Sequence, residues 1–253
     1  MDLSAVGLLL GAGLVAGTVN AVAGGGSLVT FPALLAVGLP PKPANYTNSV
    51  AVSPGYLASV YGSRRDLPRG RGNLVLLPTA ALGSLAGCLL LQATPAGTFQ
   101  FIVPFLVLGA ALVLAFQERL RRVVGHPREM SARRRAVALH TMVGLGALYG
   151  GYFGAALGVM LVAGLGLVLD EVLNRINARK NVISAVVGLV TVVVFAIIGQ
   201  VDWAAVAIVA PASLAGGYLG ARLARRLPTP VLRALIVTFG LVVGTYLLVR
   251  AVR

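Results

Sequence analysis

The sequence has few charged residues, and acidic residues are the rarest of them. Only 11% of the 253 residues are charged, against about 25% in an ordinary soluble domain. Hydrophobic residues make up 58% before any of the 32 glycines is counted. A soluble core of this size cannot bury that much apolar surface, so lipid is the expected solvent for most of the chain. This composition excludes soluble enzymes, nucleic-acid-binding modules and disordered regulators.

Cysteine and histidine are also scarce. Cys88 is the single cysteine, and it lies in an apolar run. This excludes an intrachain disulfide and any zinc or redox site of the Cys-x-x-Cys type. The two histidines, His126 and His140, belong to no metal-ligand cluster, and there is no phosphate loop or Ser-His-Asp constellation. We therefore expect no metal, no cofactor and no enzymatic activity.

Long charge-free runs predict the membrane-spanning helices. A spanning helix needs about 20 apolar residues. Such runs place spans near residues 44–61, 73–92, 99–116, 182–199, 202–220 and 231–249. Two further apolar regions, 3–41 and 136–169, are interrupted by glycine clusters, which end helices. A broken backbone at membrane depth is tolerated only where protein or a water-filled cavity satisfies it. We expect both regions to be broken or re-entrant helices.

The basic residues predict the orientation. They gather in four connections, near residues 64–71, 119–135, 175–180 and 222–226, whereas the connections at 93–98 and 200–202 carry neither lysine nor arginine. By the positive-inside rule the basic connections face the cytoplasm and both termini lie outside. The net charge of +14 is then a topology signal. Nucleic-acid binding is not expected, because no basic segment forms a domain of its own.

In this orientation the equivalent spans of the two halves run in opposite directions. The sequence carries a weak repeat as well, since Gly24-Gly25-Gly26 followed by Asn48 corresponds to Gly154–Gly158 followed by Asn181. Halves of opposite topology are typical of secondary transporters, whose site lies at the midplane between broken helices. We predict an all-α polytopic membrane protein with two inverted-topology repeats and about 8–10 membrane segments. Its parts are a first repeat (1–116), a basic cytoplasmic linker (117–135) and a second repeat (136–253).

Three polar segments are candidates for a substrate site. In residues 20–27 a glycine-rich break leads into a new helix, which offers backbone N–H groups and the positive end of a helix dipole to an anion. Residues 44–49 open the next span with more polar side chains than capping needs. The predicted lining is Asn20, Gly24, Gly25, Gly26, Ser27, Thr47, Asn48, Gly154, Gly158 and Asn181.

The third segment, residues 174–181, is basic and has two interpretations. Arg179 and Lys180 either cap the membrane edge with side chains that reach the cytoplasm, or they take part in anion entry, since charge near a membrane interior is costly. No aspartate or glutamate lies within a predicted span, so no carboxylate can relay protons there. A lone histidine at a membrane edge, such as His140, is more often structural. The substrate then either crosses as a passively driven anion or carries its own proton.

Several of these segments resemble a known family. Residues 17–27 (GTVNAVAGGGS), 31–35 (FPALL) and 44–49 (ANYTNS) are similar to first-half motifs of the TauE/SafE sulfite exporter family. Residues 150–154 and 179–181 are similar to its second-half motifs, and the resemblance covers nearly the whole chain. Two departures stand out: Ala155-Ala156-Leu157 where the family usually keeps more glycine, and Gly188 near the place where it often carries an asparagine.

The resemblance implies a multi-pass protein of the bacterial inner membrane that transports sulfur-containing anions such as sulfite or an organosulfonate. Members differ in substrate and direction, so the anion, the direction, the driving ion and the oligomeric state stay open. We expect transport, with export favoured, of a small anion bound at the midplane between the repeats. The expected partners are this anion and the lipid bilayer. A passive anion channel and a non-transporting membrane subunit are the alternatives.

Overall fold

The computed structural model describes residues 2–22, 24–67, 74–116, 119, 131–223 and 229–252, and these residues contain helices and no strand. Within this part of the chain, four helices are long and apolar enough to cross a membrane: Leu3–Ala21, Leu76–Ala93, Ala96–Ala115 and Asn174–Ile198. Further apolar helices are shorter. The prediction of an all-α polytopic membrane protein is confirmed.

The helices follow the charge-free runs closely. The first half contains α1 (Leu3–Val22), α2 (Ser27–Ala36), α3 (Pro41–Ser63), the 3₁₀ turn η1 (Arg64–Asp66), α4 (Leu76–Ala93) and α5 (Ala96–Ala115). The second half contains α7 (Ala132–Tyr152), α8 (Leu157–Val168), α9 (Leu173–Ile198), α10 (Trp203–Leu223) and α11 (Thr229–Val252). The main difference concerns α9, which begins before residue 182 because the polar segment 174–181 is itself helical.

Local sequence explains how several helices start. The carboxylate of Asp2 accepts hydrogen bonds from the Ala5 N–H (2.8 Å) and the Ser4 hydroxyl (2.9 Å), so it caps α1. The same bonds lower the pKa of Asp2, because they stabilise its ionised form. Helix α3 begins with a proline, Pro41, whose missing N–H has no partner to lose in a first turn.

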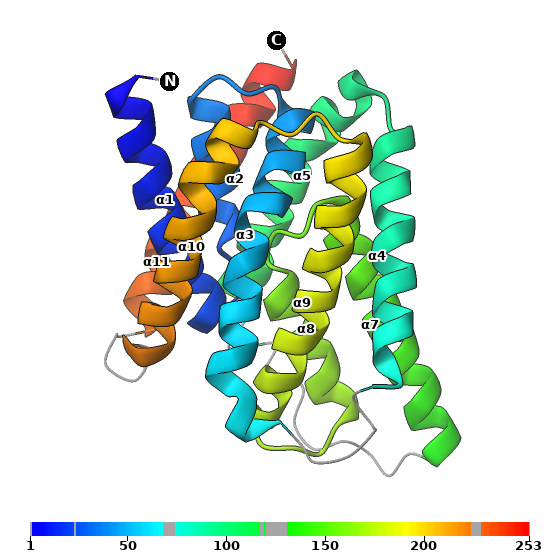
Figure 1. Cartoon of the computed structure of the whole chain (residues 1–253). Helices are drawn as coiled ribbons and strands as arrows, with labels where there is room; N and C mark the ends of the chain where they lie inside the picture. Colours follow the sequence, from blue (N-terminus) through cyan, green and yellow to red (C-terminus); the bar gives the residue numbers. More distant parts are fainter. Residues whose placement is uncertain are drawn as a thin grey trace.

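Both interrupted regions form helical hairpins that enter from opposite ends of the molecule. Helix α1 descends from the upper end in Figure 1 and α2 returns to that end, whereas α7 rises from the lower end and α8 returns there. The expectation that regions 3–41 and 136–169 are broken or re-entrant helices agrees with this arrangement. Each break contains a glycine with positive φ, Gly24 (+84°) or Gly154 (+76°).

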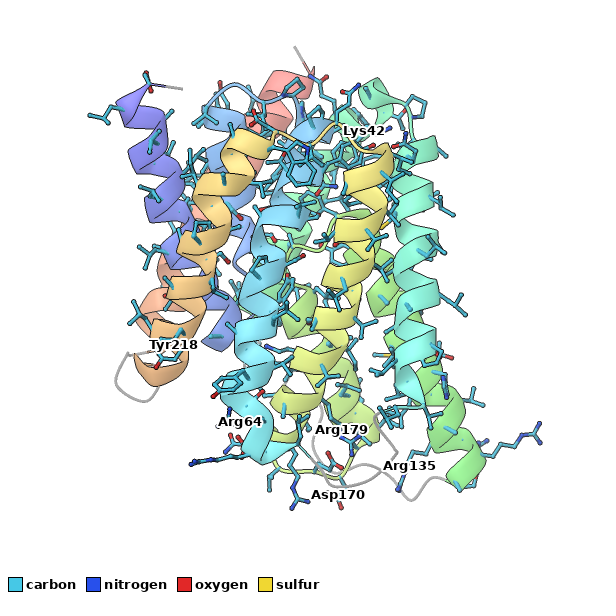
Figure 2. The ribbon with its side chains drawn as sticks, in the orientation of Figure 1. Lys42, Arg64, Arg135, Asp170, Arg179 and Tyr218 are labelled. Carbon is cyan, nitrogen blue, oxygen red and sulfur yellow. The ribbon has the colours of Figure 1, made fainter. Side chains whose placement is uncertain are left out.

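Charge is distributed unequally between the two ends. Both termini lie at the upper end. Arg64, Arg135, Arg179 and Asp170 lie at the lower end, and Lys42 lies at the upper end (Figure 2). This arrangement agrees with the predicted topology, although which end faces the cytoplasm stays a prediction. Most of the predicted linker 117–135 lies outside the described residues, as do His126, Arg69, Arg71, Arg225 and Arg226.

Helices of one half pack on helices of the other, in pairs that mirror each other. Helix α1 packs on α10, α7 packs on α4, and α3 crosses α9 near the centre. Glycines make the outer pairs close: a Cβ on Gly17 would meet the carbonyl oxygen of Ser213, and a Cβ on Gly151 would meet that of Ser84. Small residues let helix backbones approach in this way. The pairing is what an inverted repeat requires, and the repeat itself stays a prediction.

The outward faces of the helices are apolar. Exposed large hydrophobic side chains are spread over several helices, for example Leu82 (67% exposed), Leu145 (62%) and Ile197 (76%). Soluble monomers do not expose apolar surface on this scale. Such faces fit a lipid environment.

Candidate functional site

The two breaks meet in the middle of the molecule. A Cβ built on Gly24 would lie 2.6 Å from the Cα of Gly158, and one built on Gly158 would lie 2.7 Å from the Cα of Gly24. No side chain fits between backbones that close. The first break therefore touches the first turn of α8, and the structure brings these two predicted site residues together.

Asn20 organises the first break. The Gly24 N–H donates to the carbonyl oxygen of Val19 (2.9 Å), which ends α1 in the usual way for a left-handed glycine. The Gly26 N–H donates to Oδ1 of Asn20 (2.8 Å). The N–H of Gly26 is therefore engaged by the protein in this conformation. Among the described residues the N–H of Gly25 has no acceptor.

A buried amide and a buried cation lie next to this break. Asn20 is 2% exposed, and its Nδ2 has no hydrogen-bond partner among the described residues. Lys180 of α9 is also 2% exposed, and its Nζ lies 3.5 Å from the carbonyl oxygen of Asn20. Its Cδ lies 3.2 Å from the Cβ position of Gly158. An N–H donor without an acceptor and an ammonium group both favour a negatively charged ligand.

The other residues of the first break have different surroundings. Ser27, the first residue of α2, is buried and lies close to the side chain of Tyr56 of α3. A Cβ added to Gly25 would meet only side chains, at 3.3 Å from Leu114 and 3.8 Å from Leu28. A side chain at position 25 would therefore point toward α5 and not toward the second break.

Side chains of α7 and α3 hold the second break in place. The Gly154 N–H donates to the carbonyl oxygen of Tyr149 (3.1 Å), and the Tyr149 hydroxyl donates to the carbonyl oxygen of Ala155 (2.7 Å). Asn45 Nδ2 donates to the carbonyl oxygen of Tyr152 (2.9 Å) at the end of α7. Ala156 has a φ of +58°, a conformation that costs a non-glycine residue energy. The structure thus places Gly154 at the end of α7, where a Cβ would approach its own helix at Gly150.

Comparison with known proteins identifies the family of this architecture. The family model described as "Sulfite exporter TauE/SafE" matches residues 9–247, which include both breaks. The chain belongs to the TauE/SafE family. Two relatives are a "Probable membrane transporter protein" of Haemophilus influenzae, 30% identical over 94% of this chain and 91% of its own length, and the "Probable membrane transporter protein YfcA" of Escherichia coli, 29% identical over 88% and 80%. A "Probable membrane transporter protein ORF9" of Sinorhizobium sp. is 27% identical over 94% and 90%. No solved structure gave a significant match.

Gly188, one of the two departures from the family pattern, has a clear environment. Ser53 of α3 donates from Oγ to the carbonyl oxygen of Gly188 (3.2 Å), and the same Oγ lies 2.9 Å from the Cβ position of Gly188. Tyr56 lies 3.1 Å from that position. An asparagine side chain has no room here, so Ser53 supplies the polar group at this crossing of α3 and α9.

Three predicted site residues tie helices to their neighbours. Thr47 Oγ1 accepts from the Asp202 N–H (2.9 Å), and Asn48 Oδ1 accepts from the Thr30 hydroxyl. Asn181 Nδ2 donates to Ser63 Oγ (3.0 Å) and also to the carbonyl oxygen of Ser59. All three residues are buried, but these contacts serve packing of α3 against its surroundings.

Arg179 and Lys180 are adjacent, but their surroundings fit different interpretations of the basic segment. Arg179 forms a two-point ion pair with Glu171, at 2.8 Å from Nε and 2.6 Å from Nη2, and it lies at the lower end (Figure 2). Lys180 is buried and reaches the first break. A cap that extends to the cytoplasm therefore does not describe Lys180.

The first two turns of α3 bind neighbouring elements at the upper end. The bonds run from Lys42 Nζ to the carbonyl oxygen of Thr94 (2.7 Å), from the Tyr46 hydroxyl to Gln92 Oε1 (2.8 Å), from Asn45 to Tyr152, and from Asp202 to Thr47. Buried rings lie close by, with the centroid of Phe153 5.2 Å from Phe31 and 6.5 Å from Phe99. Packing and hydrogen bonds thus close the upper side of the breaks.

A cavity of about 1010 Å³ lies elsewhere, between α1, α2, α5 and α11. It is lined mainly by apolar residues such as Val15, Pro32 and Val103, and none of the predicted site residues lines it. Such a lining has few groups that could hold an anion, so we do not place the site there.

Sequence reasoning missed some buried polar groups. Oδ1 of Asn45 and Oγ of Ser213 are buried without a partner in the part of the chain that the structure describes. Asn45 belongs to a segment that the sequence singled out, whereas Ser213 stands alone in an apolar run and gives no signal. Thr30 and Tyr56 lie on predicted helices and could be linked to the site only by tertiary contacts.

Proposed function

We propose that the chain is a multi-pass protein of the bacterial inner membrane that transports, and in the cell exports, a small sulfur-containing anion such as sulfite or an organosulfonate. Membership of the TauE/SafE family and the apolar helices support transport across a membrane. One observation carries the choice of an anion: Asn20 has a buried Nδ2 without a partner among the described residues, and the buried ammonium of Lys180 contacts the carbonyl oxygen of the same residue, where two broken helices meet.

The chemistry of these groups fits a sulfur oxyanion. Its oxygens accept hydrogen bonds, and bonds from charged or well-oriented donors are the strong ones. The start of α2 adds the positive end of a helix dipole and the N–H of Gly25. Binding and movement require no covalent step, so the proposed activity is transport without enzymatic chemistry.

We favour a transporter over a passive channel because of the closed centre. The backbones of Gly24 and Gly158 are in contact, and Phe31, Phe99 and Phe153 are buried. A channel needs a continuous pore, whereas alternating access needs a site that is closed on at least one side.

The test is efflux of ³⁵S-labelled sulfite from proteoliposomes that contain the purified protein, under an imposed membrane potential. We expect efflux that saturates with sulfite concentration and is absent from protein-free liposomes. Efflux that rises linearly without saturation would indicate a channel. Absence of flux for both sulfite and small sulfonates would contradict the proposed function.

A further inference from the structure

We propose that Lys180 is the substrate-binding residue that makes this site selective for singly charged anions over doubly charged ones. The inference rests on the proposed function and deepens it, because it assigns the charge state of the substrate to one named side chain. The sequence alone left Lys180 undecided between a membrane-edge cap and a role in anion entry.

The first step is the position of the ammonium group. Lys180 lies in the second turn of α9, and its side chain passes Gly158 to reach the carbonyl oxygen of Asn20. Asn20 stands in the last turn of α1, where carbonyl groups carry the negative end of the helix dipole. The end of α1 therefore attracts the ammonium toward the first break, whose N–H groups are the proposed donors to the anion.

The second step is the amide of Asn20, an independent observation. Its Oδ1 is fixed by the Gly26 N–H, which leaves Nδ2 buried without an acceptor among the described residues. A ligand oxygen would complete this amide. The Lys180 ammonium contacts the carbonyl oxygen of the same residue. An anion held by Nδ2 of Asn20 would therefore lie near this ammonium.

The third step is charge balance. Lys180 supplies one positive charge, and the amide and backbone N–H groups are neutral. A singly charged anion and one ammonium form a pair with no net charge, which a low-dielectric site encloses at lower cost than a pair that keeps a net charge. A dianion adds a second negative charge that neutral donors offset only in part. Geometry and charge together point to a sulfonate or to bisulfite as the bound form.

The experiment compares two anions of similar shape and fixed charge, methanesulfonate (−1) and sulfate (−2), as inhibitors of ³⁵S-sulfite efflux and as ligands of the purified protein in thermal unfolding. For the wild type we expect methanesulfonate to bind at least about tenfold more tightly than sulfate. Lys180→Met should weaken methanesulfonate binding about 10- to 100-fold. Lys180→Arg keeps the charge and should keep the preference. Arg135→Met removes one exposed cation at the lower end and should change neither.

Asn20→Asp is the second variant, because it keeps the buried Lys180 in place. Its carboxylate can still accept from the Gly26 N–H, and it places a fixed negative charge beside Lys180. We expect a folded protein that binds neither anion. Anion binding that survives in this variant, or unchanged selectivity in a folded Lys180→Met protein, would overturn the inference while leaving transport intact. A wild type that binds and moves no sulfur anion would instead contradict the proposed function.

Discussion

Gly24 and Gly158 each occupy the space that the other's side chain would need. The Cβ position of one lies 2.6–2.7 Å from the Cα of the other, and Gly24 also has a positive φ. This contact joins the first break to the first turn of α8, so the two interrupted helical hairpins are in register only if both residues lack a side chain.

We therefore expect Gly24→Ala to destabilise the protein by about 2–4 kcal/mol, from the left-handed backbone and the clash together. Thermal unfolding of the detergent-solubilised protein measures this loss. Gly11→Ala is the control, because a Cβ on Gly11 meets nothing within 4 Å. Equal effects of the two substitutions would show that the breaks are not in contact.

Gly25 should behave differently from its neighbour. Its added Cβ would meet only the ends of the Leu114 and Leu28 side chains, which can move. Gly25→Ala is expected to cost less than about 1 kcal/mol. The same unfolding measurement applies, and a loss as large as that of Gly24→Ala would contradict the packing described for the first break.

The topology can be tested by labelling single cysteines in a Cys88→Ala background. Ala96 and Asp170 are exposed and lie in connections or helix starts at opposite ends of the molecule. A membrane-impermeant maleimide added to intact cells should label Ala96→Cys and should not label Asp170→Cys until the membrane is opened. The reverse pattern would invert the orientation predicted from the arginines.

His140 is expected to be structural. Its Nδ1 lies 2.6 Å from Thr79 Oγ1, so the pair links α7 to α4. His140→Ala should reduce stability by about 1 kcal/mol through the lost hydrogen bond and keep most of the sulfite efflux. Thr79→Ala is the matched control and should resemble it. Efflux that disappears in a folded His140→Ala protein would identify this histidine as the proton carrier.

Ala156 is strained by its left-handed backbone. Replacing it by glycine removes the clash of Cβ with the following carbonyl, so Ala156→Gly should raise stability by about 1 kcal/mol. Ala155→Gly serves as the comparison, because Ala155 has no positive φ and should gain nothing. A loss of stability in Ala156→Gly would mean that the Cβ makes contacts worth more than the strain.

The sequence alone predicts most of the helices and both breaks, because charge and glycine are local signals. Charge-free runs mark where lipid is the solvent, and the clusters around Gly24 and Gly154 mark where helices end. The early start of α9 was not predicted, because the polar residues 174–181 look like a connection until Arg179 and Lys180 find tertiary partners.

The candidate site is only partly predictable for the same reason. Arg179 and Lys180 are adjacent, yet about 100° of helix rotation turns one toward Glu171 and the other toward Asn20. No sequence pattern predicts which face of α9 lies against the first break. Similarly, the glycine triplet indicates a break, but only the contact with Gly158 separates Gly24 from Gly25.

The bonds made by the first two turns of α3 bear on how often the upper end opens. The bonds of Lys42, Asn45, Tyr46 and Thr47 reach α4, the end of α7 and the start of α10, so a rocking of α3 away from these elements breaks them together. At about 1 kcal/mol net for each bond, the cost is about 4 kcal/mol. Without substrate, only about one molecule in a thousand would then be open at this end. A substrate that binds only the open form would then show, from that side, an apparent affinity about a thousandfold weaker than its intrinsic affinity.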